Sequence, residues 1–359
     1  MKAIVERKSL DTILKDMQPI TNSGSFLPIL SNVSLEIKGN DFHIIASNLE
    51  TFVMSSIYVD GLEDGKTTIN ATKFRKLISA ITQEHIEISA TENHRLSISS
   101  DDGLFTLIGI GPEEFPEMPN IATDTYVEGP DITEAFQFVN TVVEKGHYML
   151  DGIHIEPTDN NSTVIVATDG KRLSYAILEG TEISEPLTIS ADVAKLTLEG
   201  RVGFGIHEDA LMLHSDRSLV ITRGKTISFP EWSAILPQDN NIEVVVDKKK
   251  LLHALKLIQV LSNGNPSNEG VLLLINNEEI RFEIKAIEVG EGDYKIPVVS
   301  SNTDELTVKI SVKMLQDIIG SFKEEEQLLL KFKEHNTAVV ITSVDNTNIL
   351  SLIMPMSIH

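Results

Sequence analysis

The ten residues INATKFRKLI, Ile69–Ile78, join the end of a β-rich run to a capping residue and an amphipathic helical pattern. Asn70 stands where a side-chain oxygen can accept a hydrogen bond from the first turn of a helix. The same arrangement returns as ISADVAKLTL from Ile189 and as ISVKMLQDII from Ile310, after spacings of 120 and 121 residues. Three copies at one period predict a fold built from three repeats.

A second set of segments repeats with the same period. VERKSLDTIL from Val5, VEGPDITEAF from Val127 and VDKKKLLHAL from Val246 each open an amphipathic helical pattern, with spacings of 122 and 119 residues. The motifs EEFPEMP and ISFPEWSAILP fall where linkers between repeats would begin. We therefore expect three domains, residues 1–122, 123–242 and 243–359.

Short β-rich runs broken by Gly, Asn and Asp occupy the sequence between these helices, among them VSLEI, FHIIA, LSISS and FTLIGI. Each third is predicted to hold two helices and about eight strands, which is an α+β fold. The helical segments are expected near residues 6–20, 72–82, 128–146, 191–201, 247–262 and 311–323.

The amino-acid composition limits the classes of function that are possible. The 359 residues include no cysteine, which excludes disulfides, thiol nucleophiles and cysteine-ligated zinc. The first residues lack an apolar signal region and no apolar run is long enough to span a bilayer, so a soluble cytoplasmic protein without membrane contact is expected.

Charge is unevenly distributed along the chain. The formal net charge of −23 argues at first against a nucleic-acid partner, because such binding depends on Lys and Arg neutralising phosphates. The six predicted helical segments nevertheless carry a net charge of +4, which leaves −27 on the remainder. Helices from the three repeats could share a basic face while the sheets are acidic.

The stretch ATDGKRLS, Ala167–Ser174, has the composition of a phosphate or catalytic loop. Its flanks, STVIV and YAIL, instead favour a strand, an Asp-Gly turn and a second strand, with a positive φ at Gly170. A plain hairpin is the preferred local interpretation.

Other motifs suggest catalysis only weakly. GLEDGKTT, Gly61–Thr68, has three residues between its glycines where a phosphate-binding loop needs four, and it continues as a strand. His154 and Glu156 imitate a zinc-deaminase signature, but the cysteine pair that it requires is absent. We predict no catalytic residue, no metal site and no cofactor.

The order of several motifs resembles a known family. The threefold repeat, LPIL at Leu27–Leu30, SNLE at Ser47–Glu50, ATDGKRL, the two FP linker starts and MPM at Met354–Met356 resemble the β subunit of bacterial DNA polymerase III, the sliding clamp. The resemblance covers the whole chain. It implies a non-catalytic processivity factor in which two copies join head to tail into a ring, with helices lining the hole and sheets outside.

Such a ring would encircle double-stranded DNA and slide without sequence specificity, because topology holds it and only weak phosphate contacts are needed. By resemblance, the DNA-facing residues are Lys73, Arg75, Lys76, Tyr148, Lys195, Lys248 and Lys249. The homodimer interface would place Phe105 and Leu107 on an edge strand against Val260 and Leu261 at a helix end.

The resemblance also assigns a role to the ATDGKRLS hairpin. Together with the C-terminal residues it would form an apolar pocket in which the replicative polymerase, the clamp loader and repair proteins dock short linear peptides. The matching residues are Leu150, Thr168, Gly170, Arg172, Leu173, Pro230, Ile235, Met354, Pro355 and Met356. Methionine suits such a site because its flexible side chain can repack against different partners.

The chain departs from the family pattern at Gly24 and Ser25, Ala234, Asn268 and the final Ser357-Ile358-His359. The last three departures are expected to alter the peptide preference. A second class of function stays open on sequence alone, a repeat-built scaffold that binds peptides or sugars without encircling DNA.

Overall fold

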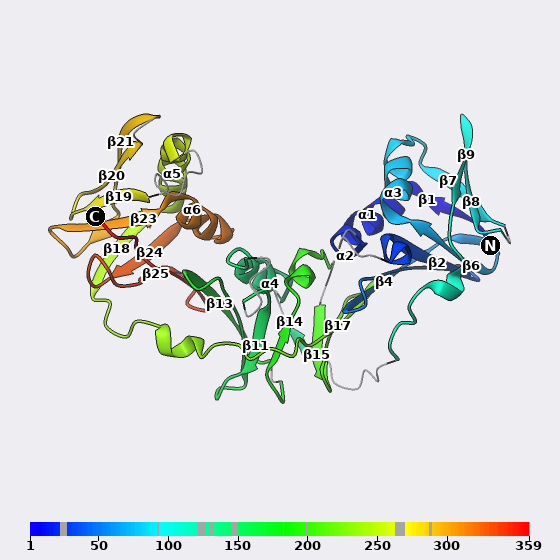
Figure 1. The fold of residues 1–359 in the computed structure, drawn as a ribbon, viewed down its shortest axis with the longest axis horizontal. Helices are drawn as coiled ribbons and strands as arrows, with labels where there is room; N and C mark the ends of the chain where they lie inside the picture. Colours follow the sequence, from blue (N-terminus) through cyan, green and yellow to red (C-terminus); the bar gives the residue numbers. More distant parts are fainter. Residues whose placement is uncertain are drawn as a thin grey trace. The chain divides into compact units, whose positions relative to one another are not determined.

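Figure 1 shows the fold in a computed structural model. The structure describes residues 1–359 except 22–26, 92, 121–126, 130–131, 145–149, 182, 199, 201, 263–269, 287–288 and 359. The chain forms two compact units, each built from two stretches of sequence. The first unit comprises Met1–Thr133 and Gly180–Lys225, and the second comprises Glu134–Glu179 and Thr226–His359.

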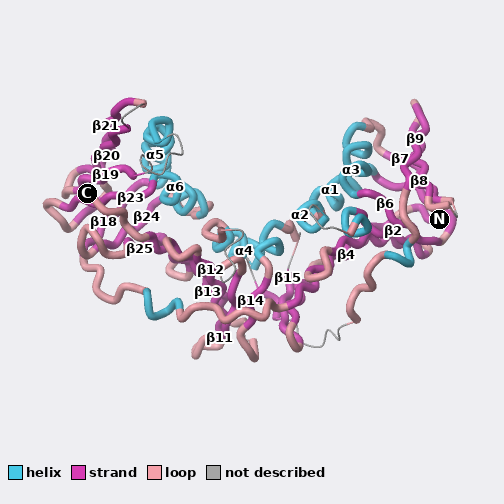
Figure 2. The backbone as a smooth tube through the Cα atoms, in the orientation of Figure 1, coloured by secondary structure: helices cyan, strands magenta, loops and turns pink. Residues whose placement is uncertain are grey.

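The first unit holds two antiparallel sheets, with strand orders β5-β1-β7-β8-β9 and β10-β15-β16-β17-β4-β3-β2-β6. Helices α1, α2 and α3 pack on these strands (Figure 2). The elements are β1 Lys2–Glu6, α1 Arg7–Asp16, α2 Gln18–Thr21, η1 Pro28–Ser31, β2 Asn32–Lys38, β3 Asp41–Ser47, β4 Thr51–Tyr58, β5 Asp60–Glu63, β6 Gly65–Asn70, α3 Ala71–Ala80, β7 His85–Ala90, β8 Arg95–Ser100, β9 Gly103–Ile108, η2 Pro112–Glu114, β10 Val127–Gly129, β14 Leu187–Ile189, η3 Ala191–Lys195, β15 Val202–His207, β16 Ala210–His214 and β17 Ser218–Arg223.

The second unit contains a sheet in which β11-β12-β13-β26-β25-β24-β18-β22 are neighbours, and a second sheet of order β21-β20-β19-β23. Helices α5 and α6 pack against each other and against these strands. The elements are α4 Ile132–Asn140, β11 Ile153–Pro157, β12 Ser162–Thr168, β13 Arg172–Glu179, η4 Trp232–Ile235, β18 Ile242–Asp247, α5 Lys248–Ser262, β19 Gly270–Ile275, β20 Glu279–Ala286, β21 Gly290–Pro297, β22 Ser300–Ser301, β23 Leu306–Ser311, α6 Val312–Ser321, β24 Gln327–Phe332, β25 Val339–Ser343 and β26 Ile349–Ile353.

Strands of the middle repeat complete the sheets of its neighbours. β17 pairs with β4, with Val220 opposite Val53, inside the first unit. β13 pairs with β26, with Leu173 opposite Leu352, inside the second unit. The repeats are therefore joined by main-chain hydrogen bonds between strands as well as by the linkers.

The repeated capping residues behave as the sequence predicts. The side chain of Asn70 accepts a hydrogen bond from the N–H of Lys73 at 3.0 Å. Ser190 accepts one from the N–H of Asp192, and Ser311 accepts one from the N–H of Met314, both at 3.4 Å. In all three repeats a side-chain oxygen satisfies a donor that the first helical turn leaves unpaired.

Two predicted helices are different in the structure. The segment expected to be helical over residues 128–146 begins in strand β10, Val127–Gly129, and its helix α4 covers only Ile132–Asn140. The segment expected to be helical over residues 191–201 forms only the 3-10 helix η3, Ala191–Lys195. Ser190 bonds to the residue two positions on, and Leu196 already has extended backbone angles. The β-branched Thr197 that follows disfavours a further helical turn. The described strands number nine, eight and nine in the three repeats, close to the expected eight.

Candidate functional site

The ATDGKRLS stretch forms the hairpin between β12 and β13, with Thr168 opposite Leu173. Gly170 has a φ of +84°, the left-handed conformation that the turn requires. The hydroxyl of Thr168 accepts a hydrogen bond from the N–H of Gly170 at 3.0 Å and donates one to the carbonyl of Arg172 at 2.7 Å. A Cβ at Gly170 would lie 3.5 Å from Cδ1 of Leu150, so Leu150 covers the turn. The hairpin prediction is confirmed.

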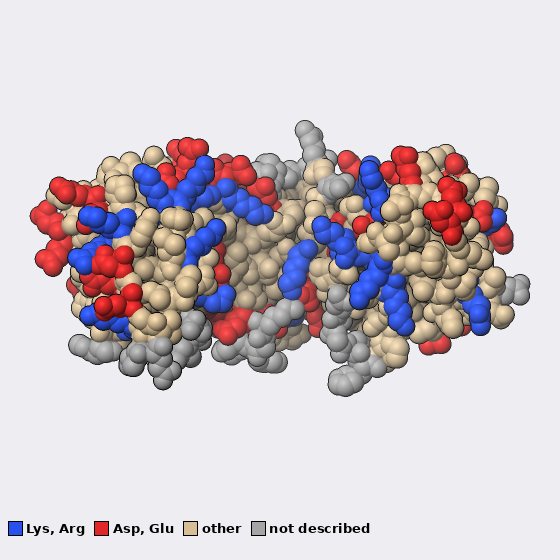
Figure 3. All heavy atoms as spheres, turned by 90° about the horizontal axis from the view of Figure 1, so that it is seen from above, with Lys and Arg blue, Asp and Glu red and all other residues tan. Residues whose placement is uncertain are grey.

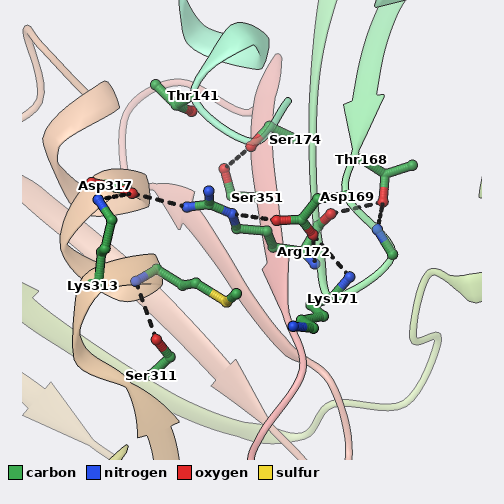
Figure 4. A network of polar contacts seen from close by, with 12 residues as sticks. Thr141, Thr168, Asp169, Lys171, Arg172, Ser174, Ser311, Lys313, Asp317 and Ser351 are labelled. Atoms are coloured by element: carbon green, nitrogen blue, oxygen red, sulfur yellow. Dashed lines mark hydrogen bonds and ion pairs between the residues drawn. The ribbon is translucent and has the colours of Figure 1, made fainter. Parts of the chain in front are cut away.

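Asp169 organises the charged side of this hairpin (Figure 4). Its Oδ1 accepts hydrogen bonds from the N–H groups of Lys171 and Arg172 at 2.9 and 2.8 Å. Its Oδ2 accepts one from Nε of Arg172 at 2.8 Å. Nη1 of Arg172 reaches Oδ2 of Asp317 on α6 at 3.3 Å, and Lys313 lies 3.5 Å from the same oxygen. The arginine is thus held between two carboxylates from different elements.

The C-terminal residues run beside the hairpin. The N–H of Met354 donates to the carbonyl of Lys171 at 2.9 Å. The N–H of Met356 donates to the carbonyl of Lys309 at 2.7 Å, which fixes the tail to strand β23. The side chain of Met354 stays exposed, and Pro355 and Met356 are half-buried. An unbranched apolar side chain is thereby presented to solvent next to the turn.

The linker ahead of β18 lies against the same part of the sheet. Phe229, Trp232 and Leu236 pack on a buried cluster of Val166, Leu173, Ala338 and Leu352. Pro230 and Ile235 belong to this linker, and both are exposed. All the residues predicted for the docking pocket therefore belong to the second unit, where the linker and C-terminal residues contact the β12–β13 hairpin or strand β13.

Glu156 and His154 on β11 hold the linker by polar and ring contacts. Nε1 of Trp232 donates to Glu156 at 2.9 Å, and Nε2 of His154 lies 3.2 Å from the other oxygen of that carboxylate. The His154 ring stacks on Phe229 with centroids 4.7 Å apart. Burial lowers the pKa of His154 below its usual 6.5, although the nearby Glu156 opposes this shift.

A surface depression of about 970 Å³ adjoins the C-terminal tail. It lies between the start of β23, the turn after β24 and the C-terminal residues, and Leu306, His335, Met356 and Ile358 are among its lining. Met356, a residue of the C-terminal tail, therefore also lines this depression.

Basic side chains gather over the helical side of each unit, with acidic side chains beside them (Figure 3). Lys73 and Lys76 on α3 and Lys249 on α5 are exposed. Arg75 is half-buried because its Nη1 donates to Gln18 at 2.8 Å and its Nε lies 3.6 Å from Asp11. Lys195 is partly exposed and forms an ion pair with Asp192.

Lys248 differs from this group. It is only 9% exposed, and its ammonium group donates to the main-chain carbonyls of Phe322 and Lys323 just after α6. This finding corrects the expectation of a DNA-facing side chain, because the ammonium group is already committed within the fold. Tyr148 lies outside the described residues.

Strand β9 forms one edge of its sheet and is unusually apolar for an exposed strand. Leu104, Phe105 and Ile108 are 68%, 44% and 73% exposed, and Leu107 is half-buried. An exposed apolar edge is a liability unless another chain covers it.

A second surface with exposed apolar residues lies in the second unit. β21 is an edge strand, and the C-terminal end of α5 packs over it. A Cβ at Gly292 would come within 2.6 Å of Leu261, so this leucine lies directly on the β21 backbone. Val260 beside it is 70% exposed.

The described residues hold no cluster of three or more His, Asp or Glu side chains arranged for a metal ion. GLEDGKTT lies in β5 and β6, so it opens no helix there. None of the helices in the described ranges has the length and apolar character needed to cross a membrane. The exposed apolar side chains on edge strand β9 and the exposed Met354 beside the hairpin are surfaces of the kind that bind another protein chain.

The comparisons with known proteins agree on one family. Residues 1–119 match the family model of the DNA polymerase III β subunit N-terminal domain, and residues 233–357 match that of its C-terminal domain. The beta sliding clamp of Chlamydia pneumoniae is 24% identical over 371 residues, covering all of both chains. The crystal structure of the Thermotoga maritima β subunit has a TM-score of 0.86 at 22% identity, again over both whole chains. A Helicobacter pylori β clamp bound to a DNA ligase peptide has a TM-score of 0.83 at 21% identity, with full coverage of both chains.

The chain belongs to the family of bacterial DNA polymerase III β subunits, the sliding clamps. Its function is that of a non-catalytic processivity factor in DNA replication.

Several residues around the β12–β13 hairpin could not be predicted from the sequence. Asp169 lies within the quoted hairpin motif, but its spacing does not reveal that it binds Arg172. Asp317 is 145 positions from Arg172 along the chain, so no local pattern joins them. Trp232 offered a signal, because it is the one tryptophan of the sequence and stands two positions after the FP motif.

Proposed function

We propose that this processivity factor works as a ring-shaped homodimer in which two copies join head to tail. The observation that carries this proposal is the apolar edge strand β9, with Leu104, Phe105 and Ile108 exposed. A head-to-tail contact pairs one surface with a different surface, and two such contacts can close a ring.

The partner surface would be the edge strand β21 together with Val260 and Leu261 of α5. Pairing β9 with β21 would continue one sheet into the next and remove both open edges. Phe105 and Leu107 would then cover the apolar end of α5. The area thus hidden from water includes the exposed Val260.

We propose that the ring encircles double-stranded DNA with its helices inside and its sheets outside. Exposed Lys73, Lys76 and Lys249 support weak contacts to phosphates without reading the base sequence. Arg75 and Lys195 would contribute less, because each is already paired within the protein. The acidic remainder of the surface would repel DNA and keep it in the hole.

The hairpin, linker and tail of the second unit would dock short linear peptides of the replicative polymerase, the clamp loader and repair proteins. Exposed Met354, whose N–H bonds to Lys171 next to the turn, and exposed Ile235 of the linker provide adaptable apolar side chains for such a peptide. The Helicobacter pylori relative has been solved with a DNA ligase peptide, which supports this kind of ligand. The differing residue Ala234 is exposed in η4, whereas Asn268 and His359 lie outside the described residues.

We further propose the division into three clamp domains, residues 1–122, 123–242 and 243–359, and a cytoplasmic location. The two matched domain models, ending at residue 119 and beginning at residue 233, support the outer boundaries. Family membership disfavours the alternative of a scaffold that does not encircle DNA.

The experiment is primer extension on primed circular DNA with a clamp loader and a replicative polymerase of the same organism. The full chain should give long products from single binding events. A variant lacking residues 354–359 should give short products while sedimenting as the same dimer. Long products from the truncated variant would refute the docking assignment, and sedimentation of the full chain as a monomer would refute the ring.

A further inference from the structure

Arg172 stands at the base of the β12–β13 hairpin, and Figure 4 shows its guanidinium between two carboxylates. Nε is bonded to Asp169 at 2.8 Å and Nη1 to Asp317 at 3.3 Å. The arginine side chain is only 11% exposed. Its charge is therefore compensated inside the protein before any peptide arrives.

The two carboxylates differ in how firmly they are held. The Asp169 side chain is 2% exposed and also accepts two main-chain hydrogen bonds, so it is an integral part of the turn. Asp317 lies on α6 and its side chain is 36% exposed. Besides Arg172, its partner among the described residues is Lys313, which forms an ion pair with it at 3.5 Å. Substitution of Asp317 can thus alter the arginine without dismantling the hairpin.

The location of the pair connects it to the docking site. Arg172 lies opposite Ile353 in the β13–β26 ladder, directly before exposed Met354. The main chain of the neighbouring Lys171 accepts the hydrogen bond from Met354. A change in the orientation or charge of Arg172 would therefore alter the affinity for a ligand that contacts Met354.

We propose that Asp317 is a positioning residue. By its ion pair it fixes the orientation of Arg172 at the docking site and compensates its positive charge, and it thereby sets the preference of the site for acidic or neutral peptide residues. This inference rests on the proposed peptide-docking function. With Asp317 in place, an acidic residue of the peptide gains little from Arg172. Without it, Nη1 loses its acceptor, and a peptide carboxylate can take that place by a charge-assisted hydrogen bond.

The size of the effect follows from the exposure of the pair. A partly exposed ion pair contributes up to about 1 kcal/mol, which corresponds to a change of about twofold to fivefold in a dissociation constant. Asp317→Ala should shift the preference for glutamate over glutamine in a peptide by this factor. Asp317→Glu should return the preference toward that of the original chain.

The test uses the DNA ligase peptide bound by the Helicobacter pylori clamp, labelled with fluorescein. Each position in turn is synthesised as glutamate and as glutamine, and binding to the full chain is followed by fluorescence anisotropy. Glu324→Ala is the matched control, because it removes an exposed carboxylate just beyond α6. Thermal unfolding of every variant shows whether the fold is kept.

The quantity compared is the affinity for the glutamate peptide divided by the affinity for the glutamine peptide. In Asp317→Ala this ratio should rise about twofold to fivefold at one or more positions. It should return toward the original value in Asp317→Glu and stay unchanged in Glu324→Ala. Equal ratios in Asp317→Ala and Glu324→Ala at every position would overturn the role of Asp317 while leaving peptide docking in place. If the unaltered chain binds none of the peptides while the Helicobacter pylori clamp binds them in parallel, the docking proposal itself fails, and this inference fails with it.

Discussion

The ammonium group of Lys248 donates a hydrogen bond to the main-chain carbonyl of Lys323 at 2.8 Å and another to that of Phe322. The first residue of α5 thereby binds the carbonyls that follow α6, which a lysine can do favourably at the C-terminal end of a helix. The contact joins two helices of the second unit and explains why a lysine is almost fully buried.

Replacing Lys248 should therefore affect stability. Lys248→Met keeps the apolar stem but leaves the buried carbonyl of Phe322 and the partly buried carbonyl of Lys323 without their donor, which should lower the free energy of unfolding by about 1–3 kcal/mol. Urea denaturation measures this loss. Lys249→Met, at the exposed neighbouring position, should stay within about 0.5 kcal/mol of the original protein. Equal stabilities of the two variants would show that the buried contact is unimportant.

Removing exposed helix lysines should weaken salt-sensitive DNA association. Alanine at Lys73, Lys76 and Lys249 together should flatten the dependence of log K on log salt by about one unit for each lysine that neutralises a phosphate. Binding of labelled linear duplex at several salt concentrations measures this slope.

The matched control removes the same charge from strands. Lys38, Lys66 and Lys285 are exposed on β2, β6 and β20. Their combined replacement by alanine should leave the salt slope close to that of the original chain. If both triple variants change the slope equally, the helical face has no special role in contacting DNA.

The proposed dimer contact predicts that Phe105→Glu gives a monomer. A charge on β9 would have to be buried against the apolar end of α5, and a buried unpaired charge is strongly unfavourable. Sedimentation velocity at micromolar concentration distinguishes the two states. Leu62→Glu is the control, since Leu62 is 57% exposed on β5 at the opposite edge of the same sheet. A dimer in Phe105→Glu, or dissociation of Leu62→Glu as well, would count against the β9 interface.

His154 should make stability depend on pH. Because burial lowers its pKa in the folded protein, the unfolded chain takes up the proton first as the pH falls through 6.5. The free energy of unfolding should therefore decrease between pH 7.5 and 5.5, with no contribution from His154 at higher pH. Urea unfolding of His154→Gln should show a smaller decrease over this range. An unchanged pH dependence would mean that His154 does not titrate as its burial indicates.

Local signals in the sequence predicted the features that depend on local chemistry. Asn70, Ser190 and Ser311 cap their helices because capping needs only the next few residues. The Asp-Gly turn at Gly170 follows from the preference of glycine for a positive φ.

Long-range packing explains what the sequence could not reveal. The charge of Lys248 indicated exposure, but its partners lie 74 and 75 positions away. The compensation of Arg172 by Asp317 depends in the same way on the packing of α6 near β13. Helical periodicity over residues 191–201 was a weaker guide, because extended backbone at Leu196 ends η3 early.

The central claim, that a closed ring holds DNA by topology, is tested most directly by retention after loading. The protein is loaded by a clamp loader onto nicked circular DNA, the salt is raised, and half of the sample is cut once. The account predicts that the protein stays on the circle and is lost from the linear DNA, whose ends let a ring slide off. Equal loss from both, while a known clamp loaded in parallel stays on its circle, would contradict the ring.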